Sequence, residues 1–196
     1  SELIKLGFSG QSVLVAPDAV NLALFKGINK EEARRKLGFP QDKKIVMYWG
    51  NFKAWKGVDT LAESVKFMKD FFVVMIGATK DTDLSRIKMT VRDYNNVLVE
   101  GFKNQDLLPT YLASADVLVL PNTAKDENSR LFTSPLKLFE YMASNRPIVA
   151  SDLPSLREVL NENNAVFFNP DDPKSLAEVV KNTLSKETLA KSLANQ

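Results

Sequence analysis

Short apolar runs alternate along this chain with longer stretches in which apolar residues recur at helical spacing. The runs are rich in β-branched and aromatic residues, which favour strands. They predict strands at 12–16, 45–50, 72–77, 97–101, 117–121, 147–151 and 165–169. The longer stretches predict helices near 30–37, 58–69, 83–93, 105–114, 135–144, 155–161, 173–184 and 186–195.

The order of these elements indicates the fold class. Repeated strand–helix units imply parallel strands joined by right-handed crossovers. Several strands are apolar throughout, which is typical of a sheet covered on both faces. We therefore expect an α/β fold with a doubly wound, Rossmann-like parallel sheet and helices on both faces. A length of 196 residues suits one domain over 1–196.

Composition narrows the chemistry. The chain has 26 basic and 24 acidic residues, a balance that argues against a nucleic-acid-binding surface. It has no cysteine and no histidine, which excludes disulfides, thiolate or imidazole metal ligands and Ser-His-Asp triads. It also has neither an apolar run of about 18 residues nor a signal-peptide pattern at its start, so we expect a cytoplasmic protein.

Sheets of this class bind ligands beyond the carboxyl ends of their strands, so the loops there are the candidate site. The first such loop is GNFKAWKG (50–57), in which Gly50 ends a strand, Gly57 opens a helix, and Lys53 and Lys56 lie between them. A helix N-terminus with a lysine can bind a diphosphate. The spacing alone favours a surface turn with solvated lysines.

The second loop is PNTAKDENSRLFTS (121–134), which is long, polar and without a pattern of its own. It ends in Ser134 and Pro135, typical N-cap and N1 residues of a helix. The free amides near Leu136 are therefore available to a phosphate. Loops of this length in compact domains are usually functional or disordered.

The helix that follows carries one polar face, formed by Lys137, Glu140 and Ser144. Lys137 at the helix start suits a phosphate, and Glu140, one turn on, suits ribose hydroxyls. The alternative is an intrahelical Lys137–Glu140 ion pair on a solvated edge. The spacing leaves both interpretations open.

Other polar patterns are better explained by local structure. Asp81-Thr82-Asp83 matches a metal-binding D-x-D pattern, but we interpret it as helix capping. Ser155 and Glu158 fit a capping box. We expect helix caps at Asp152, Asp171 and Asp172, and core packing or loop anchoring for Trp49 and Trp55.

The segment SPLKLFEYMASNRPIVASDLPSLREVL (134–160) resembles the signature region of group 1 retaining glycosyltransferases, which have the GT-B fold. Further segments resemble the family in the same order, over almost the whole chain. They are VAPDAVNLALF (15–25), YWGNFKAWKGVDTLAES (48–64), NVLVEGFKNQDLLPTYLASADVLVLPN (96–122) and NAVFFNPDDPKSLAEVV (164–180).

The resemblance implies that 1–196 is the nucleotide-sugar-binding half of a GT-B fold. A separate N-terminal domain of the full-length protein would bind the acceptor, and transfer would occur in the cleft between the two. No metal and no cofactor beyond the donor are implied. We expect the isolated domain to be a monomer without transfer activity, and the full-length protein to lie in the cytoplasm or at the inner face of a membrane.

The resemblance also implies roles for single residues. Lys56 matches a diphosphate-contacting lysine, and Glu140 matches the ribose-binding second glutamate of an E-x7-E motif; we take both as catalytic. Residues 134–136 match a phosphate-cradling loop, and 101–103 with Leu107 match the base region. The substrate-binding residues are then Gly50, Asn51, Lys56, Gly101, Phe102, Lys103, Leu107, Arg130, Thr133, Ser134, Pro135, Leu136, Lys137 and Glu140.

Two positions depart from the family. Asn51 stands where an arginine is usual, and Phe132 replaces the first glutamate of the E-x7-E motif. Arg130 in the long loop is a candidate replacement for the missing charge. These departures leave open a binding module without catalysis. A nucleotide-sugar epimerase of the same architecture is a weaker alternative, because such enzymes depend on histidines.

Overall fold

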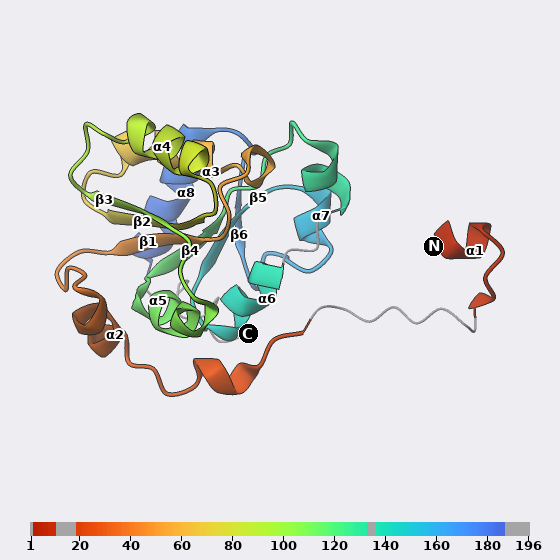
Figure 1. Cartoon of the computed structure of the whole chain (residues 1–196), viewed down its shortest axis with the longest axis horizontal. Coiled ribbons are helices and arrows are strands. Elements are labelled where there is room, and N and C mark those ends of the chain that lie inside the picture. The colour runs from red at the N-terminus through yellow and green to blue at the C-terminus, as the bar shows by residue number, and fades with distance from the viewer. Residues whose placement is uncertain (1, 11–18, 133–135, 187–196) are drawn as a thin grey trace.

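We analysed a computed structural model of the chain, which describes residues 2–10, 19–132 and 136–186. Within them, six parallel strands form one sheet of order β3-β2-β1-β4-β5-β6 (Figure 1). The strands are β1 (Ile45–Trp49), β2 (Phe72–Ala78), β3 (Val97–Gly101), β4 (Val117–Leu120), β5 (Ile148–Ser151) and β6 (Val166–Phe168). Each lies within two residues of its predicted bounds, which confirms the Rossmann-like α/β fold. The strand expected at 12–16 lies outside the described residues.

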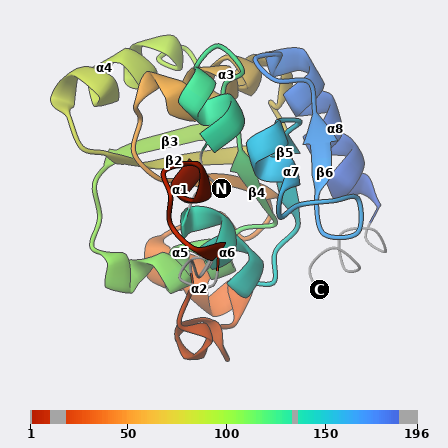
Figure 2. The same cartoon turned by 90° about the vertical axis from the view of Figure 1, so that its right-hand side faces the viewer.

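Helices cover both faces of the sheet. The α-helices of the described residues are α1 (Glu2–Lys5), α2 (Lys30–Leu37), α3 (Val58–Ser64), α4 (Asp81–Thr90), α5 (Leu108–Ser114), α6 (Leu136–Ala143), α7 (Pro154–Arg157) and α8 (Pro173–Ser185). In Figures 1 and 2, α3, α4 and α8 lie against one face, and α2, α5 and α6 lie against the other. Because successive strand residues point to opposite faces, the apolar strands supply two separate cores, one beneath each helix layer.

Short irregular helices explain two differences from the predicted helix bounds, whereas α4 begins two residues and ends three residues earlier than predicted, and α7 ends four residues earlier. The irregular helices are the 3-10 helices η2 (Leu22–Phe25), η3 (Ala54–Lys56), η4 (Val65–Phe67) and η5 (Gln105–Leu107), and the π-helix η6 (Asn128–Phe132). The helix predicted at 58–69 is α3 continued by η4, and the one at 105–114 is η5 continued by α5. The predicted helix 186–195 lies outside the described residues, apart from its first position.

The capping predictions were mostly wrong. The N-caps of α4 and α7 are Lys80 and Leu153, so neither Asp81 nor Asp152 is a cap, and Ser155 and Glu158 form no capping box. Helix α4 begins at Asp81 itself, whereas α7 begins at Pro154, two residues after Asp152 and one residue before Ser155. Only Asp172 caps as expected, because its carboxylate accepts from the amides of Lys174 and Ser175.

Strand order reverses between β1 and β4, and the two loops predicted to carry the site leave these strands side by side. They touch at Gly57, which has a φ of 67°. A Cβ at this position would lie 1.9 Å from the carbonyl oxygen of Pro121. The close approach of the loops therefore depends on the absence of a side chain at residue 57.

A buried carboxylate joins α2 to the sheet at the opposite, amino ends of the central strands. Asp116 precedes β4 and accepts from Arg34 Nη2 at 2.5 Å, from Lys30 Nζ at 3.0 Å and from the Ile45 amide at 2.7 Å. Burial opposes its ionisation, but the bond from Ile45 and the two cations outweigh burial, so the pKa of Asp116 is lowered.

We expect Asp116→Asn to lower the free energy of unfolding at pH 7 by about 2 kcal/mol, since it removes two charged hydrogen bonds. A lowered pKa in the folded state means that this stabilisation is present above the unfolded pKa of about 3.9 and is lost as pH falls through the folded value. Urea unfolding between pH 2 and 7 measures the difference. Asp93→Asn, at an 81% exposed side chain paired only with its neighbour Arg92, is the matched control. Equal losses in the two variants would contradict the role of Asp116.

Candidate functional site

A pocket of about 690 Å³ lies at the carboxyl ends of the strands, where the strand order reverses. Its walls come from the ends of β1 and β2, the loop after β3, η3, η6 and the first turns of α6. The lining residues are Trp49, Gly50, Asn51, Trp55, Lys56, Gly77, Thr79, Phe102, Lys103, Gln105, Asn128, Phe132, Leu136, Lys137 and Glu140. Pockets of this size hold small organic ligands.

Lys137 points from α6 into this pocket and not toward solvent. Only 8% of the residue is exposed, and its Nζ donates to Tyr48 Oη at 2.8 Å. The described residues place no carboxylate within 4.0 Å of this ammonium, so the predicted alternative of an intrahelical ion pair with Glu140 is wrong. Burial, and then the charge of Lys56, holds the pKa of Lys137 well below its usual range.

Lys56 enters the same pocket from η3. It too is 8% exposed, which contradicts the alternative of a solvated lysine on a surface turn. Its Nζ lies 3.7 Å from the centre of the Trp55 ring, a cation–π contact. Burial, and then the nearby charge of Lys53, lowers its pKa to about 8.

Glu140 lies one turn beyond Lys137 on α6 and is held by a neighbour. The side-chain amide of Gln105, in η5, donates to Glu140 Oε1. Burial raises the pKa of Glu140, although Gln105 and Lys137 act in the opposite direction. One oxygen is engaged by Gln105, and the other is oriented to accept hydrogen bonds from a ligand in the pocket that Glu140 lines.

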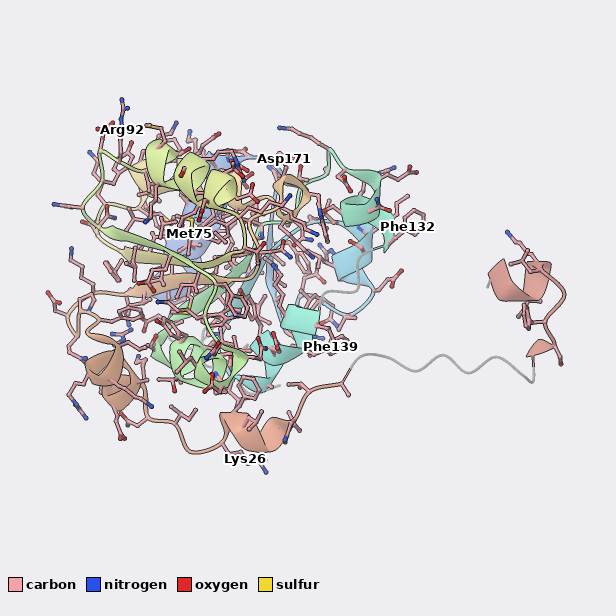
Figure 3. The ribbon with its side chains drawn as sticks, in the orientation of Figure 1. Lys26, Met75, Arg92, Phe132, Phe139 and Asp171 are labelled. Carbon is pink, nitrogen blue, oxygen red and sulfur yellow. The ribbon has the colours of Figure 1, made fainter. Side chains whose placement is uncertain are left out.

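The pocket mouth is apolar. Phe102, Phe132 and Leu136 line it and are each more than half exposed. Figure 3 shows Phe132 on the outer side of η6, directed away from the sheet. Such a patch around a polar pocket is typical of a surface that contacts a ligand or a second domain.

The loop that carries η6 is anchored by hydrogen bonds to distant segments. Asp171 accepts from Thr123 Oγ1 at 2.5 Å and from the Ala124 amide at 3.0 Å. Ser155 Oγ donates to the carbonyl of Ser129 at 2.6 Å. Asp171 and Ser155 were predicted to cap helices, but instead they fix the second loop over the sheet.

The structure brings eight of the predicted substrate-binding residues to the pocket: Gly50, Asn51, Lys56, Phe102, Lys103, Leu136, Lys137 and Glu140. Gly101 ends β3, Leu107 ends η5 and the exposed Arg130 lies in η6; none of them lines it. Thr133, Ser134 and Pro135 lie outside the described residues.

Sequence reasoning missed several lining residues: Trp49, Trp55, Gly77, Thr79, Gln105, Asn128 and Phe132. Trp49 packs in the core as expected and also reaches the pocket floor. Gly77 and Thr79, at and just after the end of β2, could have been found because consecutive strands are usually neighbours in a sheet, as β1 and β2 are here. Nothing in the sequence signalled the Gln105–Glu140 contact.

A comparison with known protein families identifies the family of this chain. The family described as "Glycosyl transferases group 1" matches residues 43–186. The chain belongs to this family. It is 25% identical over 175 residues to a putative teichuronic acid biosynthesis glycosyltransferase, TuaC, of Bacillus subtilis, covering 88% of this chain and 41% of TuaC.

Solved structures agree with this membership. Sucrose-phosphate synthase from Thermosynechococcus elongatus superposes with a TM-score of 0.79 at 25% identity, covering 99% of this chain and 49% of that one. Anabaena Alr3699/HepE, solved with UDP and glucose, superposes with a TM-score of 0.80 at 18% identity, covering 98% and 52%. The chain thus spans about half the length of the relatives it matches, and corresponds to the C-terminal half of GT-B glycosyltransferases.

Among residues 2–10, 19–132 and 136–186, no helix is long and apolar enough to cross a membrane. In the same ranges no three His, Cys, Asp or Glu side chains come together as a metal-binding group, so Asp81 and Asp83 belong to no such cluster.

Proposed function

We propose that the pocket binds a nucleoside-diphosphate sugar and that the full-length protein transfers the sugar to an acceptor with retention of configuration. The observation that carries the proposal is the presence of Lys56 and Lys137 in one pocket at the strand-order reversal, two buried lysines without a carboxylate partner among the residues that the structure describes. Buried charges are normally paired, so two unpaired cations favour an anionic ligand with at least two negative charges.

The same residues suit the chemistry of transfer. The diphosphate gains negative charge as its bond to the sugar breaks, and fixed cations stabilise that charge without a metal. Lys56 and Lys137, with the backbone amide of Leu136 at the start of α6, take this role. Glu140 accepts hydrogen bonds from the ribose, and the loop after β3, with Phe102 and Lys103, lies beside the base.

The acceptor side of the reaction belongs to the half of the GT-B fold that this chain does not span. The exposed apolar residues Phe102, Phe132 and Leu136 at the pocket mouth support docking of that N-terminal domain over the donor. We therefore expect donor binding, but no acceptor-dependent turnover, from these 196 residues.

Calorimetric titration of the chain with UDP, GDP and ADP tests the donor site. HepE has been solved with UDP and with UDP-glucose, so UDP is the first nucleotide to try. We expect one nucleotide to bind and Glu140→Ala to weaken it at least about tenfold, since hydrogen bonds to a charged group contribute about 1.5–3 kcal/mol.

Glu178→Ala is the matched control, because Glu178 is an exposed glutamate on α8 and does not line the pocket. Equal affinities of the Glu140 and Glu178 variants would contradict the ribose role. Absence of nucleotide binding by both this chain and the full-length protein would contradict the donor site. Binding without transfer by the full-length protein would favour the binding module that Asn51 and Phe132 leave open.

A further inference from the structure

A buried tyrosine, and not a carboxylate, holds the ammonium of Lys137. Lys137 Nζ lies 2.8 Å from Tyr48 Oη and 4.1 Å from the centre of the Tyr48 ring. Tyr48 Oη itself donates to the carbonyl of Asn51 at 2.8 Å. Burial raises the pKa of Tyr48 well above its usual range, so its hydroxyl stays protonated and offers a lone pair to the ammonium.

This contact sets the position of the ammonium against the first loop. A Cβ at Gly50 would lie only 2.8 Å from Lys137 Nζ and 3.0 Å from Tyr48 Oη. The Lys137 ammonium therefore occupies the space directly beside the backbone of Gly50. Residue 51, the next along the loop, carries an uncharged side chain, so the second cation of the pocket comes from α6.

The charges around the lysine pair, Lys56 and Lys137, are mostly positive. Lys137 faces Lys56 from η3, Glu140 from its own helix and Tyr48 from β1. Tyr141 in turn lies near Tyr48 and Glu140. Lys56 faces Lys53. The carboxyl group of Glu140 is therefore the counter-charge among these groups for the two buried amines, and it is only partly buried.

The remaining lysine of the pocket does not change this balance. Lys103 lies 3.2 Å from Glu100, so its charge is already paired. The pKa of Lys56 is about 8 and that of Lys137 is well below its usual range. At pH 8.5 without a ligand, the two side chains together therefore carry a charge of less than +2.

We propose that Tyr48 is a positioning residue that holds Lys137 as the second cation of the diphosphate site, and that the lysine pair takes up protons when a diphosphate binds. This inference rests on the proposed donor site. A bound diphosphate supplies the counter-charge that the pocket lacks, so both amines become ammonium ions. Nucleotide affinity then falls as pH rises, because the free protein must first be protonated.

Calorimetry at pH 8.5, in two buffers that differ in ionisation enthalpy, counts the protons. The probes are UDP, GDP and ADP, whose terminal phosphates have pKa values of about 6 and are fully ionised at that pH. We expect uptake of about half a proton or more for each nucleotide bound. Lys137→Met should bind more weakly and take up fewer protons than the wild type.

A pair of tyrosine variants tests the positioning role. Tyr48→Phe removes the acceptor of Lys137 and should weaken nucleotide binding roughly tenfold. It should also move the fall in affinity to a lower pH, because Lys137 then loses a bond that favours its charged form. Tyr111→Phe makes the same chemical change at a buried ring outside the pocket and should alter neither quantity.

The outcomes separate the two proposals. Nucleotide binding by the wild type without proton uptake overturns this inference and leaves the donor site intact. Failure of all three nucleotides to bind counts against the donor site itself. Where Lys137→Met does not fold, the tyrosine pair decides: equal affinities and equal pH profiles of Tyr48→Phe and Tyr111→Phe overturn the role of Tyr48.

Discussion

Replacing Lys56 with alanine in the full-length protein, with both halves of the GT-B fold, should slow sugar transfer about a hundredfold to a thousandfold. That is the usual cost of removing one fixed donor that stabilises charge in a transition state. Steady-state kinetics with the nucleotide sugar identified by titration measures it. Near-normal turnover would show that the lysine does not act on the leaving diphosphate.

The same variant should fold as well as the wild type. The pKa of Lys56 is lowered from 10.5 to about 8 in the folded protein, so its charge opposes folding below pH 8, and that opposition disappears as pH rises through 10.5. Lys56→Ala removes a charge that disfavours the folded state at pH 7. We therefore expect thermal unfolding at pH 7 to show no decrease in the midpoint temperature. Lys53→Ala, three residues earlier and exposed, is the control for transfer.

The largest loss of stability is expected from a single methyl group at Gly57. Gly57→Ala would place a Cβ 1.9 Å from the carbonyl oxygen of Pro121, in a left-handed conformation with a φ of 67°. Left-handed backbone costs about 1–2 kcal/mol, and relief of the overlap requires one loop to move. We expect a total loss of about 4 kcal/mol in urea unfolding.

Gly38 provides a close control. It has a φ of 70°, and a Cβ there would meet nothing within 4 Å. Gly38→Ala should therefore show only the backbone cost, about 1–2 kcal/mol. If both alanine variants lose the same stability, then contact between the two loops is not what Gly57 provides.

The sheet was predictable because its strands are short, apolar and bounded by polar turns. Buried parallel strands such as β1 and β4 need apolar residues on both faces, and this leaves a continuous signal in the sequence. The two candidate loops were singled out because they follow strands and carry glycines and lysines or a long polar stretch, and the observed strand order places them side by side. The helix ends were less predictable. A polar residue such as Asp81 or Asp152 near a helix start suits the N-cap position, but the sequence does not show at which residue the helix begins.

The orientation of the Lys137 side chain could not be predicted from the sequence pattern of its helix. Its spacing from Glu140 places both on one face, but only tertiary packing decides what that face meets. Tyr48, which holds the ammonium, is 89 residues away in sequence. Tyr141 Oη fixes α6 to β1 by accepting from the Trp49 amide at 2.8 Å, and that contact is equally non-local.

The loop after β3 has a consequence for how donor preference can change. Its backbone is tied to the sheet where the Phe102 amide donates to the Ala78 carbonyl at 2.8 Å, and α5 closes its far end. The two buried lysines stand on η3 and α6, outside this loop. On the proposed donor site, exchange of residues 102–104 between relatives is therefore expected to change the nucleobase that binds, and to leave both lysines and the Gln105–Glu140 contact in place.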